Sequence, residues 1–157
     1  MQLDHLRETN PTSLKTIGLL AFILKGREKY GKAEEQYRQL FKAAGEETVD
    51  EKTLRTSLDF GSILRNLGKN EEAIERYEQI ADEVLNLKDD IHFIGIADVI
   101  TGLAKELAAL GRAETAEKIL RLEIEKIKGE EEMLLTLALC QLALAEMLTE
   151  QERYAEV

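Results

Sequence analysis

The sequence predicts an all-α protein in which pairs of antiparallel helices stack side by side as a solenoid. Three observations lead to this prediction. Ala, Leu, Glu and Lys are abundant, whereas one Pro and no Trp occur among the 157 residues, so the composition favours helices throughout. Apolar residues recur with helical periodicity between short turn segments. The same arrangement of residues returns four times at nearly constant spacing, which is typical of a repeat architecture.

The predicted helices are bounded by local turn signals. They lie at about 12–27, 30–44, 51–66, 70–86, 90–109, 113–128 and 131–150. In the loop AGEETVDEK, Thr48 and Glu51 have the spacing of a capping box that opens the third helix. The segments LNLKDD and IKGEEE separate the later helices, and no low-complexity linker interrupts the chain. These features predict a single domain.

The corner between the two helices of a pair is clearest in LRNLGKNEEAIERY. Gly68 allows the chain to leave one helix in a left-handed turn. Asn70 is then placed to cap the next helix, where Glu71 and Glu72 meet the positive end of the helix dipole. The stretch therefore predicts two antiparallel helices joined by a tight corner.

Four such corners share one register. Their anchor positions are Ala33, Ala73, Ala116 and Val157, which are 40, 43 and 41 residues apart. A small residue lies twelve positions before each anchor, at Ala21, Gly61, Ala104 and Ala145. A leucine lies nine positions before each, at Leu24, Leu64, Leu107 and Leu148, and a large residue four positions after the first three, at Tyr37, Tyr77 and Leu120. The small residues let paired helices approach closely, and each pair needs a neighbour to cover its apolar flank.

This pattern resembles the tetratricopeptide repeat family, and its longer units are similar to those of kinesin light chains in stretches such as GREKYGKAEEQYRQL and LTEQERYAEV. The resemblance implies a right-handed superhelical solenoid in one domain over residues 1–157. Its repeat units would lie at about 12–50, 51–89 and 90–129, with a partial fourth at 130–157. The chain departs from the family in lacking the early tryptophan, and Glu28 and Glu152 replace the corner glycine.

Both ends of the chain look uncapped. The last predicted helix, EMLLTLALCQLALAEML, is apolar on almost every side, although the outer face of a terminal repeat is expected to be polar. Pro11 lies where this family commonly ends a repeat, and Leu3 and Leu6 resemble the tail of a preceding helix. We expect either that the chain is a piece of a longer array or that its ends pair with another copy. The alternative is that the last helix folds back onto its own groove.

The charge and the single cysteine exclude several classes of function. A net charge of −10 argues against binding to nucleic acids or anionic membranes. Cys140 is the sole cysteine, so an intramolecular disulfide is impossible. The opening MQLDHLRETN does not have the pattern of a secretory signal, and IGLLAFIL is too short to span a bilayer. We therefore expect a soluble cytoplasmic protein.

No constellation of catalytic or metal-binding residues is visible. His5 and His92 lie far apart, and Asp89 and Asp90 near His92 are better interpreted as the cap of a helix than as metal ligands. Cys140 lies in an apolar helix, where a buried and unreactive thiol is expected. The sequence therefore predicts no enzyme, no cofactor and no metal site.

If the resemblance holds, the first helices of successive pairs line a concave groove. The residues expected to contact a partner there are Lys15, Phe22, Lys25, Arg55, Leu58, Arg65, Asn66 and Lys105. Other positions of the third and fourth units that face the groove are Asp98, Thr101, Gly102, Ala108, Ala109, Leu139, Leu142, Ala143, Glu146, Thr149 and Glu150. Five inward cations against Asp59 and Asp98 predict an extended or helical partner segment of acidic character. Arg55 and Arg65 would bind its carboxylates. The alternative is that these cations only neutralise neighbouring carboxylates on a wet face.

The leading functional interpretation is a non-catalytic scaffold for protein–protein interaction. A second is a self-associating module joined through its ends, and concentration-dependent mass would support it. A third is a regulatory sensor fragment of a larger multidomain protein. Fold alone decides little among them, because repeat scaffolds serve many systems.

Overall fold

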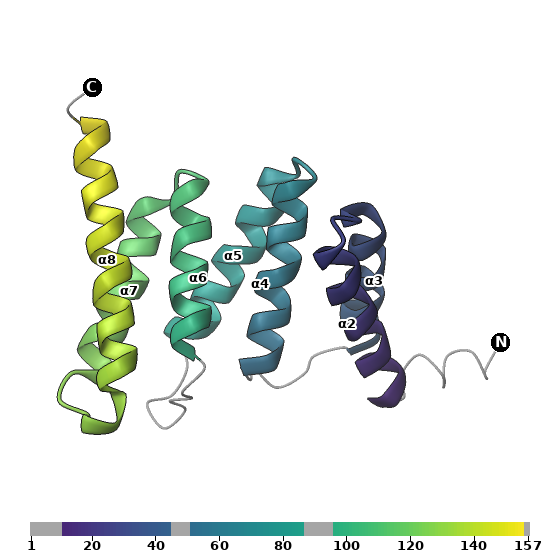
Figure 1. Ribbon diagram of the computed structural model, residues 1–157, viewed down its shortest axis with the longest axis horizontal. Helices are drawn as coiled ribbons and strands as arrows, with labels where there is room; N and C mark the ends of the chain where they lie inside the picture. Colours follow the sequence, from purple (N-terminus) through teal and green to yellow (C-terminus); the bar gives the residue numbers. More distant parts are fainter. Residues whose placement is uncertain (1–10, 45–50, 87–95, 156–157) are drawn as a thin grey trace. The chain divides into compact units, whose positions relative to one another are not determined.

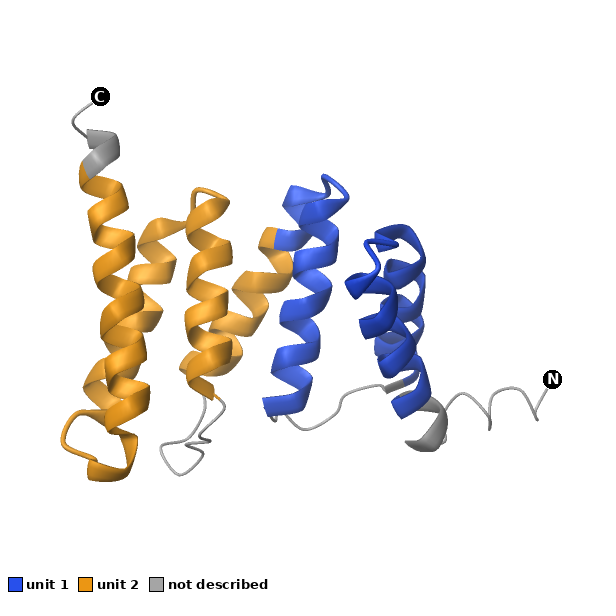
Figure 2. Cartoon of the chain, in the orientation of Figure 1, with its two compact units in different colours: residues 1–73 blue, residues 74–157 orange. Residues whose placement is uncertain are grey.

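The computed structural model describes residues 11–44, 51–86 and 96–155. Within these ranges the helices are α2 (Pro11–Gly26), α3 (Tyr30–Ala44), α4 (Glu51–Asn66), α5 (Asn70–Leu85), α6 (Ile96–Ala109), α7 (Ala113–Ile127), the short η1 (Glu131–Met133) and α8 (Leu134–Ala155), and no strand is present (Figure 1). The chain divides into two compact units, residues 1–73 and 74–157 (Figure 2). The division falls after the first turn of α5.

The helices confirm the predicted all-α class, and most of them begin and end within two residues of the predicted positions. Three boundaries are exceptions, and one of them is the start of α8 at Leu134, since the first three predicted residues form η1. The predicted start of the fifth helix, together with Asp89, Asp90 and His92, lies outside the described residues, as does Thr48 of the capping box. α8 continues to Ala155, so the corner expected at Glu152 is wrong. The sequence there contains no glycine or proline and consists largely of good helix formers, so nothing local ends the helix.

The corners that follow α2, α4 and α6 have one common backbone structure. Glu28, Gly68 and Gly111 all have positive φ, at 56°, 75° and 77°. In the second corner the N–H of Gly68 donates to the carbonyl of Arg65, and the N–H of Lys69 donates to the carbonyl of Leu64, both at 2.9 Å. The other two corners repeat this pair of hydrogen bonds. This arrangement satisfies the last carbonyls of each first helix, and the predicted left-handed corner is confirmed.

The predicted cap of α5 is wrong by one residue. The carbonyl of Lys69 accepts the first helical hydrogen bond, from the N–H of Ala73 at 3.0 Å. Lys69 therefore occupies the cap position, and Asn70 is the first helical residue. The corner is tight, because Lys69 belongs to the ends of both helices. Its N–H donates to the carbonyl of Leu64 in α4, and its carbonyl accepts the first hydrogen bond of α5. Arg112 takes the same place before α7, where no side chain caps the helix.

In unit 1, α2 and α3 form an antiparallel pair (Figure 1). Ala21 and Ala33 are both fully buried, as expected for the small residues that let the helices approach. Tyr37 is also buried, and its ring stacks on that of Phe60 from α4 with 5.7 Å between centroids. The predicted aromatic between neighbouring pairs is therefore confirmed here.

In unit 2, α6 packs against α7, and α8 packs against both. Ala104 and Ala116 are buried and take the roles of Ala21 and Ala33. The buried Tyr77 of α5 reaches towards α6, where its hydroxyl donates to the carboxylate of Glu106 at 3.1 Å. The same repeat rule therefore governs both units.

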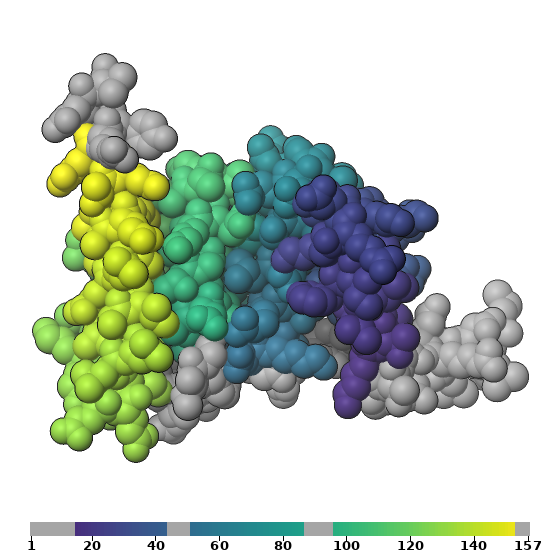
Figure 3. Space-filling view, in the orientation of Figure 1, coloured from purple at the N-terminus to yellow at the C-terminus, as the bar shows by residue number. Residues whose placement is uncertain are grey.

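α8 has one covered side. Cys140 and Met147 on that side are buried, whereas Leu135 and Leu142 are 72% and 56% exposed. Figure 3 shows α8, in yellow, along one edge of unit 2. Within the described ranges, Glu131–Glu152 is the one segment that by length and composition alone could cross a membrane, and 22% of its apolar window is buried. Its covered side forms part of a protein core.

Candidate protein-binding groove

The first-helix face of unit 1 brings α2 and α4 together. Phe22 of α2 is 60% exposed, and Lys15 is exposed on the same helix. Lys25 forms an ion pair with Asp59 of α4, and both side chains are about three-quarters buried. These two residues were predicted to face one groove from successive repeats. Their ion pair shows that the two helices lie side by side at that level of unit 1.

The remaining predicted residues of unit 1 lie along α4. The guanidinium of Arg55 contacts the carboxylate of Glu51, one helical turn earlier, at 3.0 Å. Asn66 is exposed, and its side-chain amide donates to the carbonyl of Ser62 at 2.8 Å. Leu58 and Arg65 are half-buried. The structure thus pairs two of the predicted cations, Lys25 and Arg55, with carboxylates of the chain itself.

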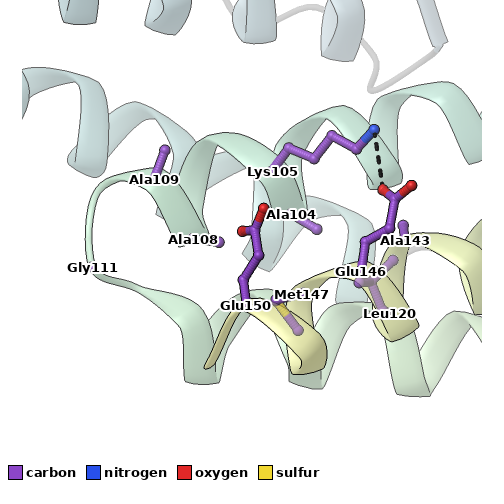
Figure 4. A pocket seen from close by; sticks show the side chains of 10 residues that line it. All are labelled: Ala104, Lys105, Ala108, Ala109, Gly111, Leu120, Ala143, Glu146, Met147 and Glu150. Atoms are coloured by element: carbon purple, nitrogen blue, oxygen red, sulfur yellow. Dashed lines mark ion pairs between the residues drawn. The ribbon is translucent and has the colours of Figure 1, made fainter. Parts of the chain in front are cut away.

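The first-helix face of unit 2 contains a hollow of about 660 Å³ between α6 and α8 (Figure 4). Six positions that were predicted to face the groove line it: Lys105, Ala108, Ala109, Ala143, Glu146 and Glu150. Leu120 and Met147 provide apolar surface beneath it, and both are buried. The repeat register therefore brings together residues from two helices that are about forty positions apart in the sequence.

The charge of this hollow differs from the basic groove that the first three repeats predicted. Lys105 reaches Glu146 across the mouth at 3.8 Å, and both side chains are more than half exposed. Glu150, one turn further along α8, has no ion-pair partner among the described residues. Figure 4 shows both carboxylates extending from α8 towards α6. The prediction of a basic groove counted the cations of the first three repeats only. The same register places the carboxylates of Glu146 and Glu150 in the groove, but the count did not include them.

The second helices carry ion pairs of a different kind. In unit 1, Arg38 contacts Glu34 at 2.8 Å and Glu72 at 2.6 Å, and Lys69 contacts Glu34 at 2.6 Å. Burial acts to raise the pKa of Glu34, but the hydrogen bonds from Lys69 and Arg38 outweigh it and hold the pKa below its usual value. These pairs connect adjacent helix pairs.

Of the cysteine and two histidines considered as reactive residues, Cys140 lies in the described part of the chain. Cys140 is fully buried. Burial, with a smaller contribution from the Glu123 carboxylate, raises the pKa of its thiol to about 11, so the thiol stays protonated at neutral pH. No group of three His, Cys, Asp or Glu side chains able to hold a metal ion occurs in the described part of the chain. His5 and His92 lie outside it.

Comparison with known proteins gives structural neighbours only. No protein-family model matches the chain, and no curated protein matches it in sequence. The chain is similar to PcrH from Pseudomonas aeruginosa, with a TM-score of 0.62 and 18% identity over 91% of this chain and 97% of PcrH. It is also similar to the type III secretion translocator chaperone SycD from Yersinia enterocolitica, with a TM-score of 0.60 and 21% identity over 90% and 94% of the two chains.

A third neighbour is a type III secretion complex from Aeromonas hydrophila, with a TM-score of 0.61 and 20% identity over 94% of this chain and 88% of that one. PcrH has been solved in complex with the chaperone binding region of PopB, and SycD with a peptide of the translocator YopD. At this level of identity the similarity concerns the fold. It confirms the predicted all-α fold of helix pairs.

Proposed function

We propose that this chain is a non-catalytic, cytoplasmic scaffold that binds an extended or helical segment of another protein. Each unit offers one candidate surface for such a segment, the first-helix face formed by α2 and α4 in unit 1 and the one formed by α6 and α8 in unit 2. The observation that carries this proposal is the hollow of about 660 Å³, because the repeat register predicted six of the residues that line it. A volume of this size is typical of binding sites.

The structural neighbours support the same function. PcrH and SycD have been solved with segments of PopB and YopD, so this fold accommodates protein segments. A translocator of a type III secretion system is therefore the first class of partner to test, and the chain would act as its chaperone. On the basis of the sequence pattern, we also propose that the chain is a tetratricopeptide repeat protein.

In unit 1, we assign contacts with the segment to Lys15, Phe22, Lys25, Arg55, Leu58, Arg65 and Asn66, and in unit 2 to Lys105. The ion pair between Arg55 and Glu51 does not prevent this role. Exposed pairs one helical turn apart stabilise by only about 0.3–0.5 kcal/mol, so a partner carboxylate can replace Glu51. The exposed ring of Phe22 supplies an apolar contact on the same unit.

The test measures fluorescence anisotropy with two labelled probes, the chaperone binding region of PopB and the YopD peptide. We expect Phe22→Glu and Arg55→Glu to weaken binding of at least one probe about tenfold, because each replaces a favourable contact by a buried or repelled charge. Lys32→Glu is the matched control, since Lys32 is exposed on α3, outside the first-helix face. Equal affinity of all three variants and the wild type would refute the assignment.

A second candidate function is self-association through the open side of α8. Leu134, Leu135 and Leu142 are each more than half exposed there, and SycD has been solved in an alternative dimer. Analytical ultracentrifugation over a range of concentrations would show a rising mass that Leu142→Glu abolishes. A constant monomer mass at high concentration would remove this candidate.

A further inference from the structure

The hollow of unit 2 is bounded by short side chains where longer ones would fit. Ala108 and Ala109 lie on α6 and Ala143 on α8, and all three line the hollow. Ala109 is exposed and Ala108 is half-buried, so neither is needed for the close approach of paired helices, which Ala104 and Ala116 provide. The space that these alanines leave open lies directly above the buried Leu120 and Met147. This geometry suits a large apolar side chain entering from outside.

The mouth of the hollow has an excess of negative charge. Glu146 and Glu150 face a single cation, Lys105, whose ammonium lies 3.8 Å from Glu146. That pair is long and exposed, so it contributes little and an incoming cation can compete for the carboxylate. Glu150 has no cationic partner within the described residues. The apolar space and the unbalanced carboxylates therefore lie next to each other, within the reach of two adjacent residues of one segment.

We propose that this hollow binds one large apolar side chain of the partner segment, and that Glu150 and Glu146 bind a Lys or Arg next to it in that segment. The proposal rests on the proposed function and specifies the chemistry of one subsite. It assigns a basic feature to the part of the segment held by unit 2. The acidic character predicted from Arg55 and Arg65 then concerns only the part held by unit 1.

The experiment uses the full chain and a displayed library of random dodecapeptides. Peptides selected on the wild type are sequenced, and one is synthesised with a fluorescent label for anisotropy. Glu150→Lys reverses the charge at the mouth, with Glu152→Lys as its matched control, because Glu152 is exposed on α8 outside the lining. Ala108→Leu fills the space. Its control is Ala138→Leu, because Ala138 is exposed on α8 and does not line the hollow. Circular dichroism confirms that each variant is folded.

The proposal expects selected peptides to combine a large apolar residue with an adjacent Lys or Arg. Glu150→Lys should weaken the synthetic peptide about fivefold, as for an exposed ion pair, and replacing the peptide's cation by Glu should restore affinity for this variant. The effect should shrink in about 0.5 M salt, since screening then acts over a few ångströms. Ala108→Leu should weaken binding more than tenfold, while both controls bind as the wild type does.

Two results would overturn the proposal and separate it from the proposed function. If the peptide keeps its affinity for Glu150→Lys and Ala108→Leu but loses it on Phe22→Glu, the subsite is wrong and the scaffold function stands. If the library yields no peptide that binds the folded wild type, both are wrong.

Discussion

Replacing Gly68 by alanine should lower the free energy of unfolding by about 1 kcal/mol. Gly68 has φ of 75°, and the space around an added Cβ is open, so the cost is a backbone cost and not a clash. A residue with a side chain loses about 1–2 kcal/mol in this left-handed region. Removing glycine from the unfolded chain returns about 0.4–1 kcal/mol, which leaves a net loss.

Glu28 and Gly31 provide the two comparisons that test this reasoning. Glu28 is exposed and holds the equivalent corner position with φ of 56°, so Glu28→Gly should be neutral or stabilising by up to about 1 kcal/mol. Gly31 lies in the first turn of α3 with open space around it and no positive φ. Gly31→Ala should therefore stabilise the chain by about 0.5–1 kcal/mol.

Thermal and urea unfolding followed by circular dichroism at one protein concentration measures all three variants. A change of 1 kcal/mol corresponds to a shift of about 2–4 °C in Tm for a chain of this size. The two Gly→Ala substitutions should have opposite signs. If Gly68→Ala and Gly31→Ala change the stability in the same direction, the left-handed backbone does not control the corner, and the explanation is refuted.

Three further predictions concern two buried groups and one half-buried group. Cys140 should resist alkylation at pH 8 in the folded chain, because its thiol is buried and its pKa is raised to about 11. In urea it should react at the rate of a free thiol. Fast reaction without denaturant would contradict the buried position. Tyr77→Phe should lower the free energy of unfolding by about 1 kcal/mol, since it removes the hydrogen bond to Glu106, and an unchanged urea midpoint would show that the bond contributes nothing. The pKa of Glu34 is lower in the folded chain than its usual value of 4.5, so its contribution is complete above that pH and is lost as the pH falls towards the lowered value. Urea unfolding should therefore show a weaker loss of stability on acidification for Glu34→Gln than for the wild type.

The helices and corners could be predicted because their causes are local. A periodic apolar face, a glycine in the left-handed position and the burial of anchor alanines such as Ala33 and Ala116 all depend on residues within one repeat. The corner at Glu152 failed for the same reason. The repeat spacing predicted a corner at this position, but the local sequence contains no residue that stops a helix, so α8 continues.

The electrostatics of the first-helix faces depend on residues one repeat apart. Lys25 meets Asp59 and Lys105 meets Glu146, at separations of 34 and 41 residues. A count of inward cations assumes that each cation is available to a partner. In these two pairs, however, the cation already contacts a carboxylate at the same level of the next first helix. The register identifies which residues face the groove, but their net charge follows only from the side-by-side placement of the helices.

The two sides of the helix pairs carry different kinds of residues, and this difference favours the first helices as the binding side. Among the second helices and corners, Arg38 and Glu72 in unit 1 and Arg112 and Glu78 in unit 2 form ion pairs between neighbouring repeats. Each of these pairs is half exposed and stabilises little, but it provides its charged groups with partners. On α6, by contrast, the exposed Ala109 has no packing role that would require a small residue. The small side chain of Ala109 leaves the hollow between α6 and α8 open at that position, so a side chain of a partner can enter there.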